Sequence, residues 1–122
     1  MVRNTATSRR PKRLTEQAPG RIREEIERRV VEIPGVTKGP SRFGHGGSFF
    51  LGGREIAHFH GNERMDIRIT KEAIRERKDS GTIDPRMRPR GASAEWLEIH
   101  VSGPKDVAFA VGLVEEAARN NA

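Results

Sequence analysis

Two histidines in one short segment are the first residues whose types and spacing could support chemistry. His58 and His60 alternate along a predicted strand, so their imidazoles share one face with Cα atoms about 7 Å apart. Such a pair can converge on a metal ion, but it needs a third ligand. The strand pairing that the sequence favours places Glu63 on that face and Asp66 on the other, and His45 could approach only through tertiary packing. We therefore interpret the pair as packed, hydrogen-bonded histidines and predict neither a bound metal nor a cofactor.

A third histidine is the candidate for proton transfer. His100 lies four residues after Trp96, so both occupy one face of a predicted strand. Histidine titrates near neutrality, which makes His100 the natural general base if the chain is an enzyme, and a structural histidine is the alternative. No Gly-x-Ser-x-Gly motif is present, which argues against a hydrolase. The absence of cysteine excludes a thiolate zinc site and a cysteine nucleophile.

A carboxylate and a guanidinium two residues apart could hold an anionic ligand. Asp66 and Arg68 share a strand face, and Arg54 lies nearby in the predicted hairpin. An adjacent arginine lowers the pKa of a carboxyl group and keeps it ionised, which suits an anchor better than a general acid. Ordinary cross-strand ion pairing is the alternative.

The predicted loop 82–94 contains three further candidate anion ligands and two prolines. Guanidinium groups bind carboxylates and phosphates in bidentate fashion, so this loop could close over an anion. The alternative is a solvated loop or pairing with Asp84 and Glu95. The three arginines are Arg86, Arg88 and Arg90.

A β-hairpin is the clearest structural pattern. Segments 54–60 and 63–69 are strand-like, and Gly61-Asn62 between them is typical of a two-residue type II′ turn. That turn would place Ile56 opposite Ile67 and His58 opposite Met65. The face away from the helices would then carry Ala57, Phe59, Asp66, Arg68, Trp96, Glu98 and His100.

Helices and two more strands surround the hairpin. Apolar spacing predicts helices over about 20–33, 71–79 and 105–119, and strands over 48–51 and 95–101. The element order is helix, strand, hairpin, helix, strand, helix, with no regular β-α-β alternation. The sequence therefore predicts an α+β fold with a mainly antiparallel sheet of about four strands, covered by helices on one face.

The charge is concentrated at the N-terminus. The net charge is +6, and residues 1–19 hold five basic groups and one acid. The length of 122 residues is enough for one domain. We expect 1–19 to be a disordered basic arm and 20–122 a single domain. The arm could bind a polyanion such as nucleic acid, although a solvated tail is favoured. With no long apolar run or secretory signal, a cytoplasmic protein without membrane contact is expected.

Four separated blocks carry a resemblance to a known family. They are 39–44 (GPSRFG), 53–60 (GREIAHFH), 66–71 (DIRITK), and 84–86 with 90–96 (DPR and RGASAEW). In this order they resemble the luciferase-domain family of small bacterial proteins, over roughly residues 20 to 120. The label derives from light-emitting oxygenases, including those of fungi, that share such a domain. The resemblance supplies no catalytic residues, and the sequence has no flavin or nucleotide fingerprint, so cofactor-free oxygenation would require only an enclosed pocket and a base.

These observations favour binding of an anionic or aromatic small molecule on the sheet face. In this hypothesis Phe59 and Trp96 stack on the ligand, Arg68 and the arginines of loop 82–94 hold its charge, and His100 moves a proton. The alternatives are a nucleic-acid-associated accessory protein acting through the arm, and a partner-binding module without chemistry. The sequence predicts no particular oligomeric state.

Overall fold

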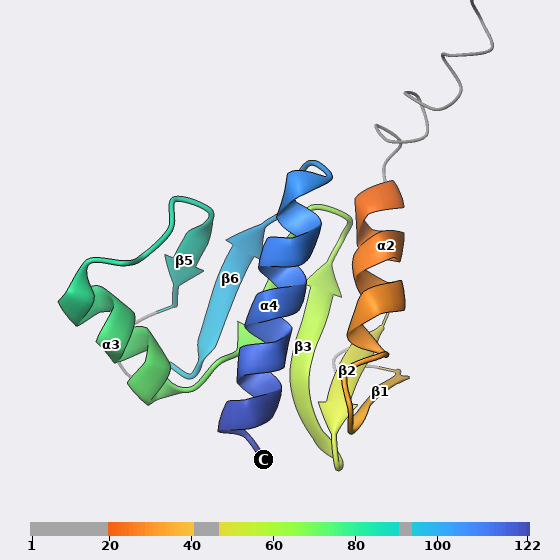
Figure 1. Cartoon of the computed structure of the whole chain (residues 1–122), viewed down its shortest axis with the longest axis horizontal. Helices are drawn as coiled ribbons and strands as arrows, with labels where there is room; N and C mark the ends of the chain where they lie inside the picture. The colour runs from red at the N-terminus through yellow and green to blue at the C-terminus, as the bar shows by residue number, and fades with distance from the viewer. Residues whose placement is uncertain (1–19, 41–46, 91–93) are drawn as a thin grey trace, which may run out of the picture.

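The computed structural model describes residues 20–40, 47–90 and 94–122, so the expected arm and His45 lie outside the described residues. Within these segments every strand pairs antiparallel, in the order β1-β2-β3-β4-β6-β5 (Figure 1). The predicted α+β class is confirmed. The elements are α2 (Arg21–Val30), β1 (Val36–Gly39), β2 (Ser48–Leu51), β3 (Arg54–His60), β4 (Arg64–Arg68), α3 (Lys71–Ser80), β5 (Met87–Pro89), β6 (Trp96–His100) and α4 (Lys105–Asn120).

Six strands in the described part of the chain correct the prediction of about four. The two additional strands, β1 and β5, are short and form the two edges of the sheet. These strands were not predicted from the sequence because Gly39 and Pro89 are residues typical of turns and loops. An edge strand tolerates proline because the missing N–H is not needed by a further neighbour. The other elements follow in the predicted order.

The helices gather on one side of the sheet. Figure 1 shows α4 crossing the middle of the sheet with α2 beside it, and α4 contacts β3, β4 and α2. Arg77 of α3 donates to Glu116 of α4 at 2.5 Å and ties α3 to this layer. Helix α2 ends at Val30, three residues earlier than predicted, where the chain continues in short i-to-i−3 hydrogen bonds. None of the helices in the described segments has the length and apolarity needed to cross a bilayer.

The two faces of the sheet differ sharply in composition. The helix-covered face carries buried apolar side chains, among them those of Ala57, Phe59, Met65, Ile67, Leu97 and Ile99. Strand alternation places ionisable and aromatic side chains on the other side. We call this side the polar face, and its residues include Glu55, His58, His60, Arg64, Asp66, Arg68, Trp96, Glu98 and His100.

The predicted register of the hairpin is wrong by one residue. Residues 61–63, not only Gly61-Asn62, form the turn, so Phe59 pairs with Met65 and Ala57 with Ile67. A slip of one residue exchanges the two faces of a strand. In the observed register Phe59 is 1 % exposed and packs edge-on against Phe49, with ring centroids 6.5 Å apart. Burying a phenylalanine on the core side, in place of two imidazoles, is the physical reason for this register.

An irregularity in β3 changes the face again near its start. Phe49 of β2 pairs with Ala57, and the next residue, Phe50, pairs with Glu55, so Ile56 has no partner in β2. In such a β-bulge two residues oppose one and the strand bends. Ile56 therefore joins Ala57 in the core, with 0 % of each side chain exposed. Glu55 consequently lies on the same face as His58, although the two are three positions apart.

Candidate functional site

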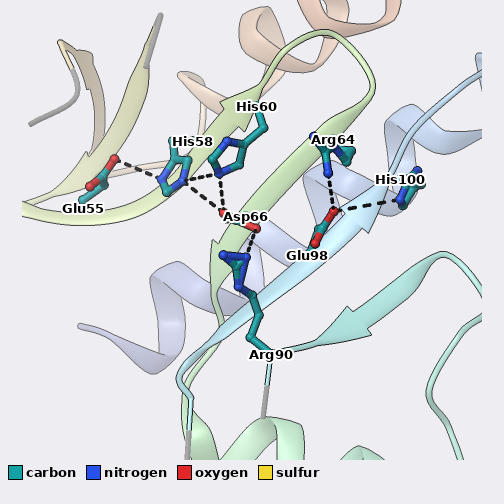
Figure 2. Close-up of polar contacts among 8 residues, drawn as sticks. All are labelled: Glu55, His58, His60, Arg64, Asp66, Arg90, Glu98 and His100. Atoms are coloured by element: carbon teal, nitrogen blue, oxygen red, sulfur yellow. Dashed lines mark hydrogen bonds and ion pairs between the residues drawn. The ribbon is translucent and has the colours of Figure 1, made fainter. Parts of the chain in front are cut away.

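Two imidazoles and one carboxylate converge at the centre of the polar face (Figure 2). The Nε2 atoms of His58 and His60 lie 3.2 and 2.7 Å from the same Asp66 oxygen, Oδ2. The two Nε2 atoms are 3.3 Å apart. The observed register makes this possible, because it pairs His58 directly with Asp66. The prediction that Asp66 faces away from the histidines is therefore wrong.

Asp66 is an ionised carboxylate within a buried environment. Only 3 % of the residue is exposed. Burial raises the pKa of its carboxyl group, but hydrogen bonds from His58 and His60 and the charge of Arg90 outweigh this effect, so the pKa lies below its usual range. Arg90 Nη1 lies 3.8 Å from Asp66 Oδ1. A negative charge is thus held at the point where both imidazoles meet.

Glu55 is the part of the cluster that the sequence did not reveal. The bulge at Ile56 directs its carboxylate toward His58, with Oε2 3.2 Å from Nδ1. The two nitrogens of His58 therefore face two carboxylates, Nδ1 facing Glu55 and Nε2 facing Asp66, which fixes the orientation of the ring. Strand alternation alone predicts that residues three apart face opposite sides, so only a recognised bulge could have indicated Glu55.

An aromatic and cationic pair borders the cluster. Arg68 pairs across the strands with Trp96, and its guanidinium carbon lies 4.9 Å from the centre of the indole ring. The indole also approaches His58, with ring centroids 5.2 Å apart. Because Trp96 comes from β6 and His58 from β3, the indole must reach over β4. Trp96 thus connects the arginine to the histidine cluster.

His100 lies in a separate group at the other end of β6. Its Nε2 is 3.9 Å from Glu98 Oε2, and Arg64 donates to the same oxygen at 3.3 Å (Figure 2). The His100 side chain is about half exposed, at 48 %. The polar face therefore contains His100, as predicted, but the described contacts join it to Glu98 and not to the His58 cluster.

The three arginines predicted to close over a ligand do not act together. Arg86 bonds to Asp84 and Asp106 and stacks on Phe109 of α4, 3.6 Å from the ring centre. Arg88 of β5 lies directly opposite Glu98 in the strand register, which places it on the polar face. Arg90 reaches Asp66 from the end of β5. The prediction that all three arginines form one cap over a ligand is therefore corrected for Arg86, which contacts the helix layer instead.

Phe59 also leaves the predicted group. It lies on the core side of β3, where Arg23 stacks on its ring at 4.7 Å. Of the residues predicted to share one face, Asp66, Arg68, Trp96 and His100 do so, because β6 pairs with β4 as that prediction required. The site that the structure assembles is therefore the histidine–carboxylate cluster with its Arg68–Trp96 border.

Several buried polar atoms of this face have no hydrogen bond among the residues that the structure describes. They belong to residues under 9 % exposed, or in the case of Arg68 about a quarter exposed. Ser48 is the cross-strand partner of His58, so it points to the same face. Such atoms are rare in folded proteins and mark places where a ligand, ion or water is expected. They are Ser48 Oγ, Asp66 Oδ1 and Arg68 Nε.

Comparison with known proteins identifies the class. The family model of the luciferase domain matches residues 53–117, which contain β3 to β6 and most of α4, and with them the whole cluster. The chain belongs to the luciferase-domain family. No curated protein and no solved structure gives a significant match.

Proposed function

We propose that this luciferase-domain protein binds a planar organic anion on the polar face. The observation that carries the proposal is the buried Arg68 Nε, which has no hydrogen bond among the described residues and lies beside the indole of Trp96. A guanidinium offers a fixed fork of donors to a carboxylate, and an indole offers an apolar surface for an aromatic ring. The two groups together fit a ligand with both features.

The surroundings of Arg68 support this assignment. Its nearest described carboxylate is the half-exposed Glu95, at 4.0 Å from Nη1, which is a loose contact. The side chain is only about a quarter exposed, at 24 %, so water satisfies it incompletely. A partly buried, weakly paired guanidinium favours an incoming anion because part of the cost of desolvating the arginine has already been met in folding.

Calorimetric titration with trans-cinnamate tests the proposal. The tag-free protein should bind cinnamate and bind its neutral amide at least ten-fold more weakly, since a hydrogen bond to a charged group contributes about 1.5–3 kcal/mol. Arg68→Gln should weaken cinnamate binding to a similar degree. Equal binding of the acid and the amide, or no binding of either, would contradict the proposal.

Arg64→Gln is the matched control. Arg64 lies on the same strand and the same face but bonds to Glu98, away from Trp96. If recognition is local, Arg64→Gln should change affinity less than three-fold at about 0.15 M salt, where charges further apart than about 8 Å are screened. A loss equal to that of Arg68→Gln would show attraction by the general field of the face instead of a site at Arg68.

A further inference from the structure

The three donor atoms at the centre of the polar face have the separations of a metal centre. His58 Nε2, His60 Nε2 and Asp66 Oδ2 form a triangle with sides of 3.3, 3.2 and 2.7 Å. An ion bonded at about 2.0–2.2 Å separates neighbouring nitrogen and oxygen ligands by about 2.8–3.6 Å, from right-angled to tetrahedral geometry. Two sides of the triangle lie in this range, and the third, between His60 and Asp66, is a hydrogen-bond distance that must lengthen slightly to admit an ion. We propose that His58, His60 and Asp66 bind one divalent transition-metal ion.

The surroundings of His58 allow a cation to replace a proton at the centre of the cluster. A neutral imidazole carries one N–H, and the Glu55 carboxylate, 3.2 Å from Nδ1 of His58, can hold that proton. A divalent ion would then take the place of the hydrogen bond between His58 Nε2 and Asp66 Oδ2 and would bond to both atoms.

Glu55 has the place of an outer partner in a metal centre. Metal-bound histidines almost always give their other ring proton to a carboxylate or carbonyl, which fixes the ring orientation. The bulge at Ile56 is what turns Glu55 toward His58, so the backbone irregularity has a specific effect on this one ring. The positive charge of Arg90 opposes a cation bound at Asp66, but solvent and salt screen this charge because the Arg90 side chain is 45 % exposed.

The donor set indicates the class of ion. Imidazole suits zinc, iron, copper and nickel, whereas magnesium and calcium prefer oxygen ligands. Three ligands from the described residues leave further coordination positions for other groups, as in catalytic zinc centres. His60 is about a third exposed, so those positions are accessible from solvent. Two imidazoles and one carboxylate with open positions can hold either Zn²⁺ or Fe²⁺.

The inference concerns the ion alone and holds whether or not an organic anion binds at Arg68. Its test therefore uses metal salts. Tag-free full-length protein is stripped with a chelator and titrated with Zn²⁺ and, separately, with Co²⁺ as a spectroscopic substitute. Trp96 is the only tryptophan and the chain has no tyrosine, so the indole 5.2 Å from His58 is a built-in reporter.

We expect one ion per chain by elemental analysis, a change in Trp96 fluorescence that saturates at that ratio, and a Co²⁺ absorption spectrum with nitrogen–oxygen ligation. His60→Ala should weaken binding at least 100-fold, and Glu55→Gln about ten-fold, as outer partners do. Mg²⁺ in large excess should not compete. His60 is suited to substitution because it is the most exposed of the three ligands, and circular dichroism checks that the variant folds.

His100→Ala is the matched control, since it removes an imidazole from the same face but outside the cluster. It should leave the stoichiometry and affinity unchanged. Two results would overturn the proposal: no saturable binding of Zn²⁺ or Co²⁺ by the wild-type chain, or binding that survives in a folded His58→Ala, His60→Ala double variant. Failure of cinnamate to bind would leave the metal result unaffected, so the two proposals fail separately.

Discussion

The carboxylate of Asp66 determines the chemistry of the polar face. It is buried and ionised, and it receives both imidazoles on a single oxygen. A buried charge is tolerated only where partners compensate it. His58, His60 and Arg90 supply this compensation for Asp66. The register that buries Phe59 is also the register that brings the two histidines to Asp66.

Phe59→Ala distinguishes the two possible faces of β3 by its effect on stability. In the observed register Phe59 is fully buried against Phe49, so removing the ring should lower the free energy of unfolding by about 3–5 kcal/mol, measured by urea denaturation. A ligand-stacking residue on the polar face would lose affinity and little stability. Near-wild-type stability of Phe59→Ala would therefore refute the observed register.

At the scale of the elements, an ion-pair network joins β5 to the start of α4. Asp106, in the first turn of α4, accepts backbone hydrogen bonds from Ser102 and Gly103 and so ties the segment before the helix to its first turn. Arg86 binds the other oxygen of Asp106 at 2.7 Å and also bonds to Asp84. The arginine predicted to hold a ligand thus fixes the orientation of the helix that covers the sheet.

This network predicts a defined dependence of stability on pH. Hydrogen bonds from Arg86 lower the pKa of Asp84 to about 2. Burial raises the pKa of Asp106, but hydrogen bonds from Ser102, Arg86 and Gly103 lower it further than burial raises it. A carboxyl group whose pKa is lowered by folding stabilises the protein above its unfolded pKa of about 4, and this stabilisation is lost as the pH falls toward 2.

Thermal unfolding of wild type and Arg86→Met between pH 7 and pH 2.5 measures this effect. Methionine keeps the apolar contact with Phe109 but removes the charge. The variant should unfold a few degrees below wild type at pH 7, and the difference should shrink as the pH falls below about 4. A difference independent of pH would mean that Arg86 acts through packing alone.

At the scale of the whole molecule, the described core is built from all three helices and from both the edge and the central strands. The apolar cluster runs from Ile26 of α2 to Ala118 of α4. Residues 1–19 contain few apolar side chains and most of the excess positive charge. Their composition suits interaction with polyanions better than burial.

Deletion of residues 1–17 should leave the midpoint of thermal unfolding within about 4 °C of the full chain, the scale of about 1 kcal/mol for a domain of this size. The same deletion should abolish any binding to a polyanion such as heparin that weakens steeply with added salt. Zinc binding should be unchanged, because none of its proposed ligands lies in the deleted segment. A larger fall in the midpoint would show that the segment packs on the domain.

The sequence by itself determined the element types and most of their positions. Apolar periodicity identified the three helices, β2, the hairpin and β6, because an element that buries one face repeats its apolar residues at the period of a helix or a strand. It also determined that Asp66 shares a face with Arg68 and that Trp96 shares a face with His100, since alternation within β4 and β6 is regular. The pairing of β4 with β6, which brings the two pairs to one face, came from the structure. The edge strands were missed because Gly39 and Pro89 are typical of turns.

Only the tertiary structure decided which side the histidines occupy. A turn of two residues and a turn of three are both compatible with Gly61-Asn62, and the packing of Phe59 and Met65 against the core selects the longer one. The bulge at Ile56 likewise depends on the pairing with β2, which lies outside the hairpin. Both choices arise from contacts between distant segments, so His58, His60, Asp66 and Glu55 meet for a reason that local residue patterns do not contain.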